Sequence, residues 1–132
     1  LSAHRTPTEV ETFAREAKGR GIKVILAGAG MAAALPGVIA ASTTIPVIGI
    51  PIKGMLDGLD AMLSIIQMPP GIPVATVGVN GAQNAAILAV EMLALADEDL
   101  AQRLANYKEG LKQKIVKANQ DLCEVKYQYK TN

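Results

Sequence analysis

Two long stretches of the chain, residues 24–52 and 61–90, contain no Asp, Glu, Lys or Arg. A stretch of this length would cross a membrane if it formed one continuous apolar helix. Prolines interrupt both stretches, however, and proline ends or kinks a helix. The interrupting prolines are Pro36, Pro46 and Pro51 in the first stretch and Pro69, Pro70 and Pro73 in the second. We therefore expect no membrane span, but segments buried on more than one side, in a core and in contacts between identical subunits.

Short apolar runs alternate along the chain with segments of helical periodicity. The runs expected to form strands are 24–27, 47–50 and 74–77. Helices are expected at 7–20, 58–67, 82–95 and 98–119, and a further one should run from near Ala32 or Pro36 to about Ser42. This alternation predicts a parallel sheet with helices on both faces and ligands at the carboxyl ends of the strands. Helix 82–95, rich in Ala, should be buried nearly all round, and helix 98–119 should be amphipathic.

Composition excludes several kinds of partner. The net charge is +1 and aromatic residues make up 3% of the chain, so neither a phosphate-binding track nor a base-stacking platform for nucleic acid is expected. The single cysteine, Cys123, has no partner for an internal disulfide and no neighbouring Cys or His for a metal. A lone thiol of this kind is typical of a reducing cytoplasm.

The segment Gly28-Ala29-Gly30-Met31-Ala32-Ala33 follows an expected strand and precedes an expected helix. It matches the loose pattern of a dinucleotide-binding turn, in which glycines let backbone amides approach a phosphate. A nicotinamide site would also require an acidic residue about 20 positions later, to hold the ribose. This chain has Ile52 and Lys53 there, so the pattern favours a turn that binds another anion or ligand through its amides.

The only histidine, His4, lies in a short loop with Ser2 and Arg5. This loop combines an acid/base group with a hydroxyl and a multi-donor cation suited to phosphate, although a lone histidine is also a common surface residue. Thr6-Pro7-Thr8-Glu9 has the form of a capping box for the helix that follows.

Three further polar positions have a structural explanation beside a functional one. Asp57 and Asp60 bracket a helix start, where they would stabilise the positive end of the helix. Asn80, near the end of the third expected strand, would either touch a ligand or form a plain turn that caps the next helix.

Six ordered motifs, covering the chain up to about Leu95, resemble the bacterial and archaeal PurE family. They are Ser2-Ala3-His4-Arg5-Thr6-Pro7, Ala27-Gly28-Ala29-Gly30 with Leu35-Pro36-Gly37, Pro46 to Pro51, Leu56 to Asp60 with Ser64 to Pro69, Gly71 to Ala75, and Asn84-Ala85-Ala86. The resemblance implies a three-layer αβα sandwich of the flavodoxin or Rossmann kind in residues 1–122. The polar residues 123–132, which include Tyr and Lys, are expected to form a tail or an intersubunit arm. The resemblance also implies a homo-octamer that uses no metal or organic cofactor. The composition and the prolines, for their part, predict a cytoplasmic protein that binds neither membrane nor nucleic acid.

The family acts in purine biosynthesis. By resemblance, the chain would be an isomerase, a mutase that moves the carboxylate of 5-(carboxyamino)imidazole ribonucleotide from the exocyclic nitrogen to the ring carbon. The alternative is a lyase, a carboxylase that adds carbon dioxide directly to aminoimidazole ribonucleotide; both give 4-carboxy-5-aminoimidazole ribonucleotide. The implied acid/base is His4. The implied substrate-binding residues are Ser2 and Arg5 for the phosphate, with Ala3 beside them, and Gly28, Ala29, Gly30 and Leu35 around carbon dioxide and the imidazole.

The chain departs from the family pattern at several points. The family's Gly-Ser-x-Ser-Asp loop would precede Leu1, so an upstream strand–helix–strand portion is expected. Ala34 and Met31 stand where the mutase branch has other residues, whereas Arg5 is typical of that branch and favours the mutase. A non-catalytic nucleotide-binding module and an assembly scaffold are the remaining hypotheses.

Overall fold

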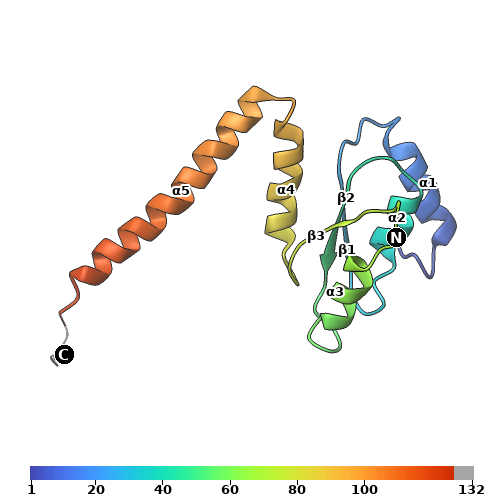
Figure 1. Cartoon of the computed structure of the whole chain (residues 1–132), viewed down its shortest axis with the longest axis horizontal. Helices are drawn as coiled ribbons and strands as arrows, with labels where there is room; N and C mark the ends of the chain where they lie inside the picture. The colour runs from blue at the N-terminus through green and yellow to red at the C-terminus, as the bar shows by residue number, and fades with distance from the viewer. Residues whose placement is uncertain (127–132) are drawn as a thin grey trace. The chain divides into compact units, whose positions relative to one another are not determined.

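Three short apolar strands form a parallel sheet in the order β1–β2–β3 (Figure 1). In this computed structural model, which describes residues 1–126, the strands are β1 Ile25–Ala29, β2 Val47–Pro51 and β3 Ala75–Thr76. Ile25 is in register with Val47, and Ile48 with Ala75. All five residues of β2 are buried, which explains why its sequence is continuously apolar instead of alternating. The three expected strands are thus present.

Helices cover both faces of the sheet. On one face lie α1 (Pro7–Ala17), α2 (Leu35–Ala41) and α3 (Leu59–Ile66), and on the other lies α4 (Ala82–Ala94) (Figure 1). Val47 of β2 packs into the cluster that contains Val10 of α1 and Ile39 of α2. The next residue, Ile48, packs with Ala85 and Ala89 of α4, because successive side chains of a strand point to opposite faces. The predicted parallel αβα sandwich is confirmed.

Gly49 lies at the centre of β2 and lets α3 approach the sheet closely. A Cβ atom at this position would collide with Cγ2 of Ile65 in α3 and lie 3.1 Å from Cγ1 of Val74. Ile65 is fully buried against this part of the sheet. The glycine is therefore required by the close approach of a helix, and not by an unusual backbone angle.

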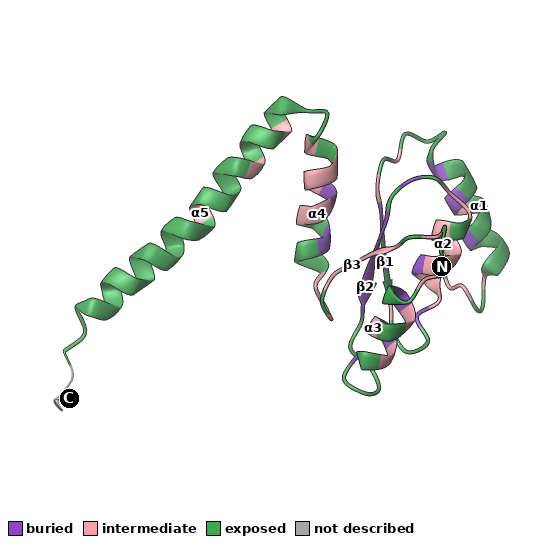
Figure 2. Cartoon of the chain, in the orientation of Figure 1, coloured by how far each residue is buried: buried purple, intermediate pink, exposed green. Residues whose placement is uncertain are grey.

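The expectation that the helix after β3 is buried nearly all round is wrong for this chain. Only Ala85 and Ala89 of α4 are buried, and both lie on the side that packs against Ile48 and Ile50 of β2 (Figure 2). Ala86 and Leu93 are exposed. The alanine-rich composition predicted the helix correctly. Composition does not specify, however, how much of the helix surface is buried by other parts of the same chain.

The last helix, α5 (Glu98–Cys123), belongs to a second unit that begins at Ala94. Its N-cap is Asp97, whose carboxylate accepts a hydrogen bond of 2.9 Å from the amide of Leu100. None of its residues is buried, although Leu111 and Ile115 follow the expected apolar spacing. Of the expected tail, Cys123 is still helical and residues 127–132 lie outside the described part. Within residues 1–126, no helix has the length and apolarity that a membrane span requires.

Candidate active site

The loops that leave the carboxyl ends of the three strands contain unusual backbone conformations. Among residues 1–126, the non-glycine residues with a positive φ are Met31 and Ala33 after β1, Leu56 and Asp57 after β2, and Asn80 after β3. The left-handed conformation costs a residue with a Cβ atom roughly 1–2 kcal/mol. Strained residues tend to cluster at functional sites, and here they mark the edge of the sheet where parallel α/β proteins bind ligands.

A cavity of about 410 Å³ opens at this edge. It is lined by two segments that are far apart in the sequence, residues 1–5 before α1 and residues 28–35 after β1. Every site residue implied by the family resemblance lines it, namely Ser2, Ala3, His4, Arg5, Gly28, Ala29, Gly30 and Leu35. The structure thus brings the predicted residues together, while their individual roles stay predictions.

The expected capping box at Thr6–Glu9 is wrong. Thr6 is the residue before the first turn of α1, but its side chain makes no hydrogen bond to the helix. Its Oγ1 instead accepts a hydrogen bond of 2.8 Å from the amide of Ser2. The same hydroxyl is 3.1 Å from the carbonyl oxygen of Ser2, to which it donates. The hydroxyl therefore closes the loop that carries His4 and Arg5, because a nearby backbone partner competes with the helix end for it.

The glycine-containing turn is held against the loop that follows β2. The amide of Ile52 donates to the carbonyl of Ala29 at 2.9 Å, and the amide of Ala33 donates to the carbonyl of Gly30 at 3.0 Å. A Cβ atom on Gly30 would lie 3.4 Å from the carbonyl oxygen of Ile52, so the two backbones are close together. Gly28 and Gly30 have no positive φ; Met31 and Ala33 adopt the left-handed conformation instead.

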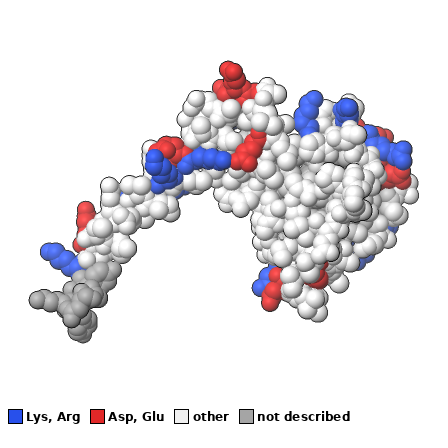
Figure 3. Space-filling view, viewed as in Figure 1, with Lys and Arg blue, Asp and Glu red and all other residues white. Residues whose placement is uncertain are grey.

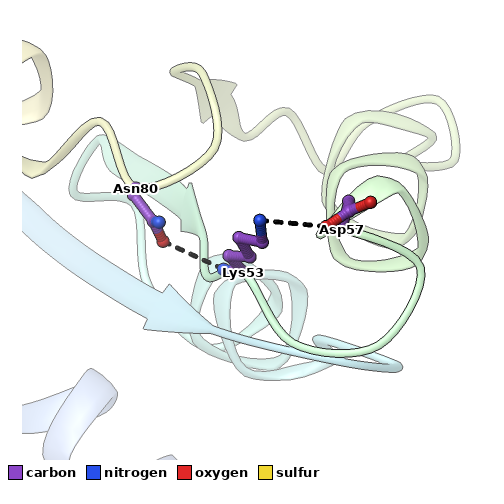
Figure 4. Close-up of polar contacts among 3 residues, drawn as sticks. All are labelled: Lys53, Asp57 and Asn80. Carbon is purple, nitrogen blue, oxygen red and sulfur yellow. Dashed lines mark hydrogen bonds and ion pairs between the residues drawn. The ribbon is translucent and has the colours of Figure 1, made fainter.

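A second group of polar residues connects the loops after β2 and β3, and the sequence analysis did not identify Lys53 as part of it (Figure 4). The amide of Lys53 donates to Oδ1 of Asn80 at 2.9 Å, and the amide of Asn80 donates to the carbonyl of Pro51 at 2.8 Å. Asn80 has a φ of +58°, which asparagine tolerates better than most residues. These contacts support a turn role for Asn80, whose side chain accepts from the loop that follows β2.

The two aspartates near α3 behave differently from each other. Asp60 lies in the first turn of α3, as expected, and its Oδ1 accepts a hydrogen bond of 2.9 Å from the amide of Ala61. Asp57 lies before the N-cap, which is Gly58, and forms an ion pair of 2.9 Å with Nζ of Lys53 (Figure 4). Both members of that pair are largely exposed, so it contributes at most about 1 kcal/mol.

The fold and the cavity together define a class of protein: a parallel α/β protein in which an imidazole, a guanidinium and a glycine-containing turn line one cavity at the carboxyl edge of the sheet. A family model described as AIR carboxylase matches residues 1–114. The chain belongs to this family, as the PurE motifs predicted.

Individual relatives agree with this assignment. A protein of Pyrococcus abyssi named N5-carboxyaminoimidazole ribonucleotide mutase is 59% identical over 113 residues, which are 85% of this chain and 65% of the relative. A chloroplastic phosphoribosylaminoimidazole carboxylase of Vigna aconitifolia is 50% identical over 123 residues, which are 92% of this chain and 22% of the relative. The crystal structure of Treponema denticola PurE superposes with a TM-score of 0.82 at 30% identity, covering 92% of this chain and 76% of that one. The chain spans slightly less than two thirds of the length of the Pyrococcus abyssi relative.

Proposed function

We propose that the protein is a 5-(carboxyamino)imidazole ribonucleotide mutase of purine biosynthesis. The observation that carries this proposal is the single cavity lined by His4, Arg5 and the turn Gly28–Gly30. An acid/base group, a cation and closely approaching backbone amides are what a reaction on a phosphorylated imidazole requires. The family match, and the name and 59% identity of the Pyrococcus abyssi relative, support the same substrate.

In the proposed reaction, the bond between the exocyclic nitrogen and the carboxylate breaks, and carbon dioxide is released within the cavity. A carbon–carbon bond then forms at the ring carbon. The proton lost from that carbon ends on the exocyclic nitrogen, so the reaction is an isomerisation without an external acid, base or oxidant. His4 is the proposed proton carrier, because an imidazole can both accept and donate a proton near neutral pH.

The other cavity residues would position the substrate. Arg5 offers several N–H donors in a planar group suited to phosphate, and Ser2 adds a hydroxyl. Gly28, Ala29 and Gly30 present backbone to the cavity with little side-chain bulk, which leaves room for carbon dioxide and the imidazole ring. Ala3 and Leu35 would contribute apolar surface that excludes water, which protects a labile carboxylated intermediate.

Replacement of His4 by Asn tests the proposal in the full-length protein. We expect turnover of the carboxyamino compound to fall by about 10²-fold or more, because a general acid/base contributes roughly 10²–10⁴-fold to rate. Thr8→Val, an exposed substitution on α1, is the matched control and should leave turnover unchanged. If His4→Asn retains near wild-type turnover, the assignment of the acid/base is wrong.

Direct carboxylation is the second candidate, favoured by the name of the Vigna aconitifolia relative and by the presence of Ala34 and Met31 beside the cavity. Two parallel assays distinguish the reactions. One supplies aminoimidazole ribonucleotide with excess bicarbonate, and the other supplies the carboxyamino compound alone. The mutase, which Arg5 favours, is supported if product forms efficiently from the carboxyamino compound and not from bicarbonate. Efficient formation from bicarbonate supports the carboxylase.

We also propose that the protein is a cytoplasmic homo-octamer. Much of the face of the first unit seen in Figure 3 carries no charged side chain. Exposed apolar residues such as Leu93 on α4, and Leu111 and Ile115 on α5, offer surface for contacts between copies. Assembly of this kind would give the uncharged stretches the additional burial that their composition indicates.

A further inference from the structure

The backbone of Ser2 and the side chain of Thr6 are joined in both directions. Oγ1 of Thr6 accepts from the amide of Ser2 at 2.8 Å and donates to the carbonyl oxygen of Ser2 at 3.1 Å. The amide of Thr6 also donates to that carbonyl, at 2.8 Å. These contacts join the two ends of a loop that contains Ala3, His4 and Arg5, all of which line the cavity. Two of the three hydrogen bonds that join the ends of this loop, which carries the predicted acid/base and phosphate-binding groups, are made by one partly buried hydroxyl.

The Thr6 hydroxyl serves this loop and not the helix beside it. A hydroxyl at an N-cap usually accepts from an amide in the first turn of the helix, but α1 receives no such bond. Pro7, at the start of α1, has no N–H that would require a partner. Removal of the hydroxyl would therefore leave the hydrogen bonds of α1 intact, and the loop would be closed by the backbone bond from the amide of Thr6 to Ser2 alone.

We propose that Thr6 is a positioning residue, which holds His4 and Arg5 in place for catalysis through its paired hydrogen bonds to Ser2. The inference rests on the proposed function of the cavity. His4 and Arg5 are both exposed side chains, so their positions depend on the backbone that carries them. A displacement of about 1 Å in a catalytic group can lower a rate by roughly 10²-fold. A single hydroxyl would then affect both proton transfer and phosphate binding.

Two substitutions at Thr6 separate the hydroxyl from the rest of the side chain. Thr6→Val keeps the shape and removes the hydroxyl, whereas Thr6→Ser keeps the hydroxyl and removes the methyl group. In the full-length protein we expect Thr6→Val to lower kcat/KM by about 10- to 100-fold, with kcat lowered through His4 and KM for the ribonucleotide raised through Arg5. Thr6→Ser should restore both parameters, and Thr8→Val, on the exposed surface of α1, should resemble the wild type.

Amide hydrogen exchange of residues 1–10, followed by mass spectrometry, gives a readout that does not depend on turnover. We expect faster exchange in Thr6→Val than in Thr6→Ser or Thr8→Val. Unchanged exchange in Thr6→Val, faster exchange without any change in kcat and KM, or equal impairment of Thr6→Ser and Thr6→Val would each overturn the inference. An inactive wild type would instead contradict the proposed function, and the exchange measurement would still decide whether the hydroxyl orders the loop.

Discussion

At the scale of single residues, the turn after β1 has its left-handed conformations at Met31 and Ala33 and not at its glycines. Gly28 and Gly30 have a different role, because without Cβ atoms they let the turn pack closely against Ile52. The strained conformation is therefore adopted by two residues that have a Cβ atom and that line the cavity. Met31 is also 62% exposed, so packing of its own side chain contributes little to hold this conformation.

Met31→Gly should stabilise the protein. It removes a steric cost of roughly 1–2 kcal/mol, partly offset by the greater freedom of glycine in the unfolded chain, about 0.4–1 kcal/mol. We expect the free energy of unfolding, measured by urea denaturation, to rise by about 0.5–1 kcal/mol. Ala32→Gly is the matched control, because Ala32 has no positive φ, and it should lower the free energy. Equal losses in both variants would show that the backbone at Met31 is not strained.

At the residue level, the sequence predicted which residues lie together, while their roles in catalysis and binding stay predictions. A histidine, an arginine and a glycine-containing turn could be grouped from the family motifs, and one cavity contains them all. The hydroxyl of Thr6 could not be assigned, since a Thr-x-x-Glu pattern fits a capping box and a closed loop equally well. Lys53 was missed because its contact to Asn80 is made by the backbone amide, which every residue except proline possesses.

At the scale of elements, the loops after β2 and β3 are joined by Asn80. Its side chain accepts from Lys53 and its amide donates to Pro51, so both ends of the contact lie at the carboxyl end of β2. β3 itself is short, with two residues paired to β2. The asparagine thus extends the connection between these strands beyond the point where the ladder stops.

Substitutions at Asn80 should have graded effects. Asn80→Gly tolerates the positive φ but loses the side-chain acceptor, and should lower the free energy of unfolding by about 1 kcal/mol. Asn80→Ala loses the acceptor and adds backbone strain, so its loss should be larger by roughly another 1 kcal/mol. Asn84→Ala, at an exposed position of α4, should change the free energy by less than about 0.5 kcal/mol. Denaturant unfolding of the three variants measures this order, and a milder effect of Asn80→Ala than of Asn80→Gly would contradict it.

The order and type of the elements were predictable because each has its own period or composition. Residues 24–27 and 47–50 are apolar runs followed directly by Gly28 and Pro51, and β1 and β2 are found at these places. The burial of α4 was not predictable in the same way. An alanine-rich helix fits a completely buried position and a position with one packed face equally well, and the choice depends on neighbours that the segment does not encode.

At the scale of the whole molecule, α5 has 26 residues and none of them is buried. A helix in water obtains most of its stability from packing of an apolar face. Leu111 and Ile115 lie four positions apart and therefore on the same side of α5, and they are 42% and 73% exposed. A face of this kind is suited to contact with another copy of the chain, in line with the proposed octamer.

Ile115→Lys should therefore weaken assembly. A lysine in an apolar contact must be desolvated or must separate the surfaces, and either effect shifts the equilibrium towards smaller species. Native mass spectrometry of the full-length protein should give the mass of eight chains for the wild type and smaller species for Ile115→Lys. The neighbouring Lys114→Gln changes charge at an exposed position and should leave the mass unchanged. An unaltered mass for Ile115→Lys would exclude this face from the interface.

The missing side chain at Gly49 sets the spacing between two layers of the sandwich. Because no Cβ atom stands between them, Ile65 rests directly on the central strand and α3 lies closer to the sheet than a larger residue would permit. The loop 52–58 starts at β2 and ends at α3, so its span is determined by that same separation. A larger side chain at position 49 would thus push α3 away from the sheet, and this displacement would pass along the loop to Ile52, whose amide is bonded to Ala29 in the cavity lining.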